Sequence, residues 1–378
     1  MITRQRVITY GIPTLAAATV ILAFGLHPWR SGSLIEPKPE PVQSDRHRID
    51  VVFAVDTTSS MSGLLDGAKR TVWSIATHVR QLDPQAELHV GLVAYRDIGD
   101  AYVTKDFALT SDMDGVFAEL SKYQAEGGGD TPEDVAAGLH DALHNMQWRS
   151  GAQKMIFLVG DAPPADRGDV ARFDVLASEA SAAGIKLNTI RCGFDPETET
   201  AWKQIASLGH GEYSSIQQDG GVQQVATPYD RKLAELSATI DGTAVIAGDE
   251  GKRDSWRANV AANAAAPAAA VADRAGYYAT GGGERDKADV VGAAMGSGSA
   301  AGAVQGVAPE ALPAELRGLD KAQLTQEIEK RVAVRKEAQK QLQELNTERN
   351  DYLAKHGAKG DGFDAKVKAT VDRQLKMK

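Results

Sequence analysis

Cysteine is nearly absent from this sequence of 378 residues, in which Cys192 is the single example. One thiol cannot form a disulfide within the chain, and it cannot build a zinc site that needs several cysteines. A net positive charge is also missing, since the formal net charge is −9. Both ends of the chain are basic, so the central part is more acidic than the whole. An acidic domain repels phosphate backbones, and we therefore expect no nucleic-acid partner.

The N-terminal segment lacks charge over twenty residues, 7–26, which follow Arg4 and Arg6. This run is long enough to cross a bilayer as a helix and long for the core of a signal peptide. No small-x-small cleavage site follows it, because histidine and tryptophan occupy the junction. We expect residues 1–30 to be an inner-membrane anchor or a removed signal peptide, with the rest exported to the periplasm or cell envelope. Residues 31–48, which include three prolines, then form a linker.

From residue 49 onward, short apolar runs alternate with segments of helical periodicity. The runs VVFAV and MIFLV show no alternation of polar and apolar residues, which is typical of parallel strands covered on both faces. The gap before residues 102–108 suits a hairpin, so that strand is expected to be antiparallel at an edge. The pattern predicts an α/β fold for residues 49–245, with a doubly wound, mostly parallel sheet. The expected strands are 49–55, 88–95, 102–108, 154–160, 185–191 and 212–216.

The C-terminal third has a different composition. Residues 250–316 are rich in alanine and glycine, which favours either a flexible connector or a small-residue helix that packs on the domain or on the tail. Residues 317–378 carry an apolar stripe at spacings of three and four, interrupted by Arg335 and Arg349. This pattern predicts a helical or coiled-coil tail that offers a surface for self-association.

Oxygen-bearing side chains follow three of the predicted strands. Asp56, Thr58 and Ser60 alternate after the first strand, so they point the same way in an extended segment. Thr131 lies in the loop GGGDTPED, and Asp161 follows another buried strand directly. Each residue alone has the ordinary interpretation of a helix cap, but ligands bind where the carboxyl ends of parallel strands meet. Carboxylate and hydroxyl oxygens without imidazole or thiolate favour Mg²⁺ or Mn²⁺ over zinc or copper.

These loops resemble the metal-ion-dependent adhesion site of von Willebrand factor type A domains, whose first motif is Asp-x-Ser/Thr-x-Ser. The matching positions here are Asp56, Thr58, Ser60, Thr131 and Asp161. The flanking segments YRDIGD, GGGDTPED, FLVGDAPP and LNTIRCG further resemble an exported bacterial branch related to domains found beside alpha-kinases. No kinase motif accompanies them. The resemblance implies that hydroxyls and carboxylates hold Mg²⁺ or Mn²⁺ and leave one position for an acidic side chain of a protein partner.

We therefore expect a non-enzymatic, cation-dependent protein-binding protein, and two alternatives stay open. One is a metal-independent envelope scaffold with a vestigial site. The other is a magnesium-dependent phosphatase of the haloacid-dehalogenase type, which needs a second carboxylate where this chain has Thr58. His140 and His144 are expected on a solvated or half-buried helix face. Asp97 and Asp100 are expected either to form a turn or to contribute to ligand choice at the rim.

Overall fold

The computed structural model describes residues 47–376 except 130, 223, 281–285 and 357–359. The predicted anchor or signal peptide and nearly all of the predicted linker lie outside these residues. Among the helices that the structure does describe, none is both long and apolar enough to span a bilayer.

A six-stranded sheet forms the centre of the fold, in the order β3-β2-β1-β4-β5-β6. Neighbouring strands pair in parallel, except that edge strand β3 is antiparallel to β2. The prediction of a mostly parallel sheet with one antiparallel edge strand is therefore confirmed. The strands are β1 (Arg48–Asp56), β2 (Glu87–Tyr95), β3 (Thr104–Thr110), β4 (Gln153–Gly160), β5 (Ile185–Cys192) and β6 (His210–Ile216).

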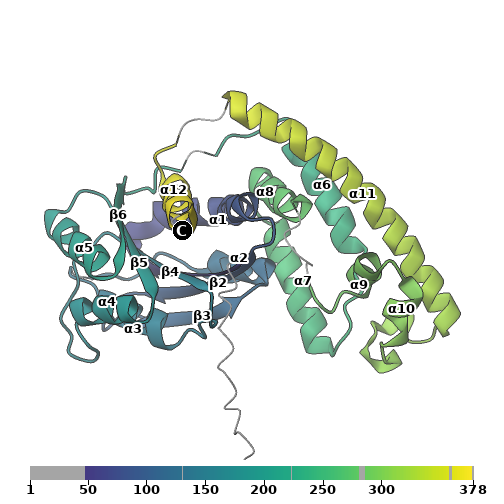
Figure 1. Cartoon of the computed structure of the whole chain (residues 1–378), viewed down its shortest axis with the longest axis horizontal. Helices are drawn as coiled ribbons and strands as arrows, with labels where there is room; N and C mark the ends of the chain where they lie inside the picture. The colour runs from purple at the N-terminus through teal and green to yellow at the C-terminus, as the bar shows by residue number, and fades with distance from the viewer. Residues whose placement is uncertain (1–46, 130, 223, 281–285, 357–359, 377–378) are drawn as a thin grey trace, which may run out of the picture. The chain divides into compact units, whose positions relative to one another are not determined.

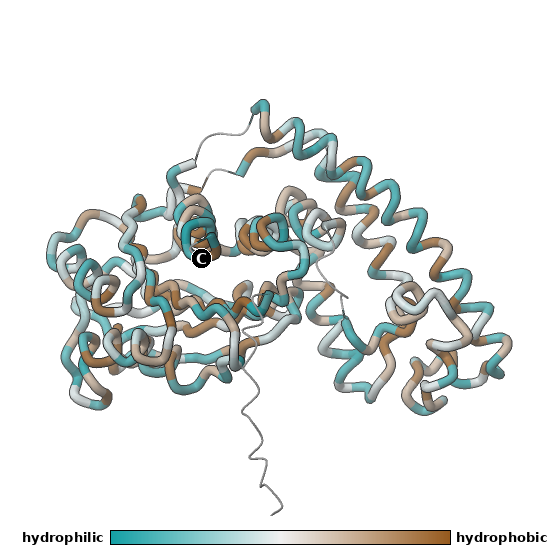
Figure 2. The backbone as a smooth tube through the Cα atoms, viewed as in Figure 1, coloured by the Kyte–Doolittle hydropathy of each residue, from teal (hydrophilic) through white to brown (hydrophobic). Residues whose placement is uncertain are grey.

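Helices cover both faces of this sheet (Figure 1). Consecutive side chains of β1 alternate between two hydrophobic cores, with Phe53 on one face and Val52 and Ala54 on the other. Burial on both faces explains why residues 51–55 of β1 are all apolar. Apolar segments accordingly mark the strands in Figure 2. The helices between strands are α1 (Ser62–Leu82), α2 (Met113–Lys122), α3 (Val135–His144), α4 (Phe173–Ala182) and α5 (Pro196–Leu208).

The remaining helices follow the sheet in sequence. They are α6 (Asp230–Gly242), α7 (Glu250–Ala264), α8 (Ala268–Ala279), α9 (Val290–Ser297), α10 (Ala300–Gln305), α11 (Lys321–His356) and α12 (Phe363–Lys376). The Ala- and Gly-rich segment therefore forms helices, of which α8 packs against α1 and α6. Buried Ala270, Ala272 and Ala275 allow α8 to approach its neighbours closely.

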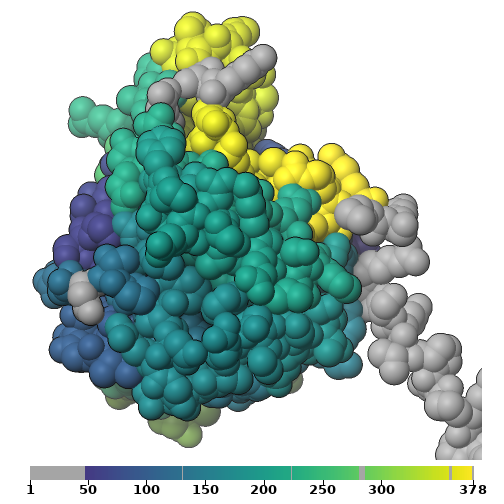
Figure 3. Space-filling model, turned by 90° about the vertical axis from the view of Figure 1, so that its left-hand side faces the viewer, coloured from purple at the N-terminus to yellow at the C-terminus, as the bar shows by residue number. Residues whose placement is uncertain are grey.

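The last two helices, α11 and α12, pack against earlier elements of the chain. Helix α11 packs its apolar face against α6, α8, α9 and α10, and its two stripe arginines are buried. Helix α12 returns to the sheet, where the ring centroid of Phe363 lies 6.1 Å from that of Phe53. The Gln374 side-chain amide also donates to Asn188 on β5 at 2.6 Å. Figure 3 shows this yellow segment lying against the teal part of the sheet domain. In the part of the chain that the structure describes, α11 packs on α6 and α8, and α12 packs on α1 and β6.

Candidate metal centre

The first loop brings three predicted oxygen donors together. Asp56 is the last residue of β1 and is completely buried. Its Oδ1 accepts hydrogen bonds from the backbone N–H of Thr58 at 2.8 Å and from the Thr58 hydroxyl at 2.7 Å. The Thr58 and Ser60 hydroxyl oxygens are 3.2 Å apart. Thr57 points the other way and its hydroxyl donates to the Tyr95 carbonyl. The alternation expected at positions 56, 58 and 60 is therefore present.

The third loop places Asp161 next to this group, directly after β4. Strands β1 and β4 approach closely there, because a Cβ added at Gly160 would lie 3.1 Å from the Cβ of Asp56. The Asp161 carboxylate accepts a hydrogen bond from the Gln218 side chain, which also donates to the Ser60 carbonyl at 3.1 Å. Gln218 therefore connects the first and third loops, a role that no sequence motif indicated.

The second loop contributes Glu133, a buried residue that is not among the five positions matched to the adhesion site. Its backbone N–H donates to the Pro163 carbonyl at 3.1 Å, and its carbonyl accepts from Ala165 at 2.7 Å. These bonds tie the second loop to the third. Gly128 lies between Glu133 and the first loop. A Cβ added at Gly128 would be 2.9 Å from Thr58 and 3.4 Å from the Glu133 carboxylate. Glu133 is therefore close to the first loop as well. The signal available in the sequence was an acidic residue within GGGDTPED.

Thr131, by contrast, is exposed and is followed by a cis peptide bond to Pro132. Among the hydrogen bonds of the described residues, none joins Thr131 to the first or third loop. The structure thus brings together four of the five predicted side chains and leaves Thr131 at the rim.

Burial and repulsion between carboxylates raise the pKa values of Asp56 and Glu133. Burial raises the pKa of Asp56 from 3.8 to about 7, and the charge of Asp161 adds to the effect. Burial likewise raises the pKa of Glu133 to about 8, with further contributions from Asp56, Asp97, Asp100 and Asp161. Within the described chain, Asp56 Oδ2 and Glu133 Oε2 are buried without a hydrogen-bond partner. A buried carboxylate oxygen without a partner is costly, and a cation would remove that cost.

The donor set is mixed. No three His, Cys, Asp or Glu side chains of the described residues converge into a group that could hold a metal by themselves. A cation at this edge therefore also needs the hydroxyls of Thr58 and Ser60. Oxygen-only coordination of this kind suits Mg²⁺ or Mn²⁺, which also retain water ligands. The residues present fit such an ion.

Two neighbouring acidic residues, Asp97 and Asp100, interact with residues of the loops. Asp97 forms an ion pair with Arg167, and the Asp100 carboxylate accepts a hydrogen bond from the Gly128 N–H at 3.2 Å. Both residues therefore support the hairpin and the glycine loop. His140 and His144 have ring centroids 4.7 Å apart on α3, where they lie at least partly exposed as expected.

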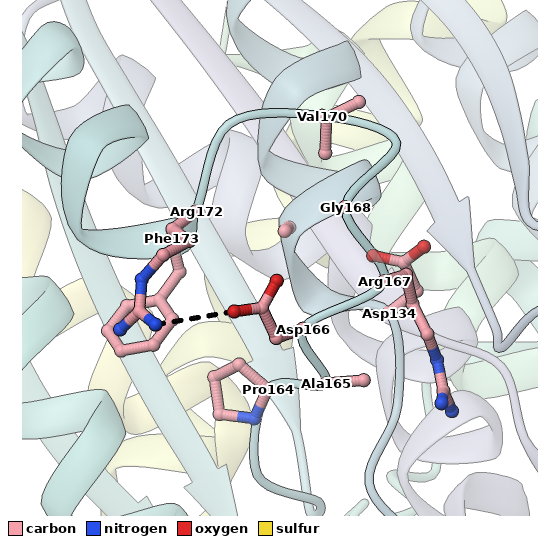
Figure 4. A pocket seen from close by; sticks show the side chains of 10 residues that line it. Asp134, Pro164, Ala165, Asp166, Arg167, Gly168, Val170, Arg172 and Phe173 are labelled. Atoms are coloured by element: carbon pink, nitrogen blue, oxygen red, sulfur yellow. Dashed lines mark hydrogen bonds and ion pairs between the residues drawn. The ribbon is translucent and has the colours of Figure 1, made fainter.

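A pocket of about 120 Å³ lies between the start of α3 and the loop after β4 (Figure 4). Its charged groups have partners. Arg172 pairs with Asp166 at 3.3 Å, and the Asp134 side chain caps α3 by accepting from the Ala137 N–H at 2.9 Å. The pocket therefore offers no unpaired charge comparable with that of Asp56.

Comparison with known proteins finds partial matches. Alpha-protein kinase vwkA of Dictyostelium discoideum is 26% identical over 116 residues, which cover 30% of this chain and 18% of that protein. Human von Willebrand factor A domain-containing protein 7 is 33% identical over 114 residues, covering 30% and 12%. The chain thus matches less than a fifth of the length of either relative. The structure of BatB from Bacteroides thetaiotaomicron is 17% identical, with 45% of this chain and 90% of that chain covered and a TM-score of 0.34.

The match to a family model is longer than either pairwise match. Residues 50–227 fit the model described as von Willebrand factor A domain. This range includes all three loops of the candidate metal centre and all of the sheet except the first two residues of β1. The chain therefore contains a von Willebrand factor type A domain at residues 50–227.

Proposed function

We propose that this protein binds a protein partner through a divalent cation, Mg²⁺ or Mn²⁺, held at the carboxyl edge of the sheet. The observation that carries the proposal is the pair of buried carboxylate oxygens, Asp56 Oδ2 and Glu133 Oε2, that have no partner among the described residues. Structural ion pairs and helix caps do not explain them, because their pKa values are raised rather than lowered. A cation would stabilise both ionised forms.

Each residue has a distinct part in this proposal. Asp56 and Glu133 supply negative charge from inside the loops, and Asp161 lies beside them at the surface. The Thr58 and Ser60 hydroxyls are neutral donors, so they fix the position of the ion without satisfying its charge. A cation bound in this way supplies one Lewis-acidic position for a carboxylate from a partner. Thr131, exposed at the rim, is placed to contact that partner, and no catalytic group is proposed.

The proposed setting is the cell envelope. Its support is the uncharged run 7–26 after two arginines, which favours an exported protein anchored in the inner membrane or released from it.

Unfolding measured with and without Mg²⁺ tests the proposal. Binding to the folded state alone stabilises by RT ln(1 + [L]/Kd), about 2.7 kcal/mol at a hundredfold excess over Kd. We expect Mg²⁺ to raise the melting temperature and EDTA to reverse the shift. Asp56→Asn should abolish the shift and stay folded, while Asp166→Asn, in the exposed loop after β4, should keep it.

Three results would contradict the proposal. Identical melting in Mg²⁺ and EDTA would favour a metal-independent scaffold. A Mg²⁺ shift that persists in Asp56→Asn would place the ion elsewhere. Turnover of a phosphate ester that Asp56→Asn eliminates would instead support the hydrolase alternative.

A further inference from the structure

Phe194 is the most exposed of the large apolar side chains identified as exposed in the described chain, at 81%. It lies in the loop between β5 and α5, at the same edge of the sheet as the candidate metal centre. A single exposed aromatic residue is not unusual by itself. Its significance depends on how firmly the loop holds it and on what surrounds it.

The backbone on both sides of Phe194 is fixed. The Gly193 N–H donates to the Ile216 carbonyl at 3.1 Å, and Gly193 has a φ of +71°, which favours glycine. On the other side, the Asp195 carboxylate caps α5 by accepting from the Thr198 N–H at 2.7 Å. Pro196 then occupies the start of that helix. The ring is thus presented on a rigid loop, which lowers the entropy that a binding event would cost.

The same loop is bonded to the candidate metal centre. The Thr198 hydroxyl donates to the Asp161 carbonyl at 3.2 Å and to the Asp195 carboxylate at 2.6 Å. Gln218, which donates to the Asp161 carboxylate, lies directly against Gly193. Two independent contacts therefore connect the loop that carries Phe194 to Asp161.

Exposed acidic side chains occur in the loops at this edge. Asp195 and Glu197 follow Phe194 in the sequence, and Asp219 follows Gln218, which lies against Gly193. Asp169 is exposed on the loop after β4, where Asp166 pairs with Arg172. Two copies of such a face would repel each other. A partner with basic residues around its contact segment would be attracted.

We propose that Phe194 is an apolar anchor next to the cation, and that this surface binds a basic protein segment in which a carboxylate side chain stands close to an apolar one. The carboxylate would reach the cation, the apolar side chain would cover the Phe194 ring, and flanking Lys or Arg would face the acidic rim. Aromatic residues at the centre of an interface commonly dominate its affinity. This inference rests on the proposed function and specifies the chemistry of its partner.

A displayed peptide library provides the probe. Twelve-residue peptides with one fixed central Glu and random flanks are selected on the full-length chain in Mg²⁺ and eluted with EDTA. We expect enrichment of an apolar residue within a few positions of the Glu, together with Lys or Arg. By fluorescence anisotropy, Phe194→Ala should weaken a selected peptide at least tenfold, while Phe194→Leu should retain most of the affinity. Val334→Ala, at an exposed apolar position on α11, is the matched control and should have no effect.

The outcomes separate this inference from the proposed function. Selection that yields no peptide eluted by EDTA would contradict both. Peptides that bind in Mg²⁺ but bind Phe194→Ala as tightly as the parent would contradict only the role of Phe194. Mg²⁺-dependent dimerisation that Phe194→Ala abolishes would show a second copy as the occupant and would also overturn the proposal. Magnesium affinity of Phe194→Ala, measured without peptide, should equal that of the parent.

Discussion

Arg274 on α8 donates from Nε and Nη2 to the two carboxylate oxygens of Asp114 on α2, at 2.6 Å each. Its Nη1 donates to Asp241 on α6 at 2.7 Å and to the Ser237 hydroxyl at 2.9 Å. All four side chains are buried. One arginine therefore joins a helix of the von Willebrand factor A domain to two helices that follow it in sequence.

Arg274→Ala should destabilise the protein strongly. The substitution leaves Asp114 and Asp241 buried without their counter-charge, and breaking a buried pair in this way costs about 3–5 kcal/mol. Urea unfolding should show that loss as a lower midpoint. Arg231→Ala removes an arginine whose side chain is 92% exposed on α6, and it should change the free energy of unfolding by less than about 0.5 kcal/mol. Equal effects of the two variants would contradict a structural role for Arg274.

The sequence pattern predicted the strands of the sheet but did not predict the ion pairs of such buried arginines. Strand patterns are local, so apolar runs and a short hairpin were enough to place all six strands. In the sequence Arg335 and Arg349 interrupt an apolar stripe, and in the fold they donate to Asp289 and Asp230. Those partners lie 46 and 119 residues away along the chain, and no periodicity indicates pairing at such separations.

The return of α12 to the sheet leads to a second prediction. Phe363 and Val367 are buried in the core cluster that contains Phe53. Phe363→Ala should lower the free energy of unfolding by about 3–5 kcal/mol, because a large buried ring is replaced by a cavity. A fragment of residues 45–245 lacks α12 altogether and should lose near-ultraviolet circular dichroism. Val334→Ala is the exposed control. A fragment as stable as the full chain would show that α12 is dispensable.

Glu133 supports a third prediction, which concerns the metal. Glu133→Gln removes one charge from the proposed site, so Mg²⁺ affinity measured by calorimetry should fall about tenfold or more. In EDTA at pH 8 the variant should be more stable than the parent by about 1–3 kcal/mol, because a buried carboxylate without a partner is lost. Glu126 is exposed and precedes the glycine loop, so Glu126→Gln should change neither the Mg²⁺ affinity nor the stability in EDTA. Unchanged affinity in Glu133→Gln would exclude this residue from the site.

Local sequence pattern identifies some residues of the candidate site but not all of them. Asp56, Thr58 and Ser60 meet because alternation along an extended segment is a local property, and Asp161 joins them because β4 is the neighbour of β1. The sequence could not distinguish Thr131 from Glu133. That choice depends on backbone bonds from Glu133 to the loop after β4, which form only in the folded chain.

Thr131 therefore gives a fourth prediction. Since its side chain is exposed and apart from the other donors, Thr131→Ala should leave Mg²⁺ affinity nearly unchanged. It should weaken binding of a peptide selected in Mg²⁺, if the rim residue engages when the partner arrives. Thr131→Ser keeps the hydroxyl and is the matched variant. A large loss of Mg²⁺ affinity in Thr131→Ala would place this residue among the ligands of the free protein.

The last prediction concerns pH. The folded-state pKa values of Asp56 and Glu133, about 7 and about 8, lie above their ordinary values of 3.8 and 4.5. Between about pH 4 and pH 8 the metal-free folded protein therefore binds more protons at these groups than the unfolded chain does. Their contribution to stability is present at low pH and is lost as the pH rises through the folded pKa values. Mg²⁺ bound at the proposed site would keep both groups ionised in the folded protein and would remove this loss.

The stabilisation by Mg²⁺, taken as the difference between urea unfolding in Mg²⁺ and in EDTA, should consequently grow from pH 5 to pH 8. Taking this difference cancels the titration of histidines that the ion does not affect. The double variant Asp56→Asn, Glu133→Gln should show almost no difference at any pH, because neither perturbed carboxyl remains. A Mg²⁺ effect of equal size at pH 5 and pH 8 in the parent would mean that the ion does not bind these two carboxylates.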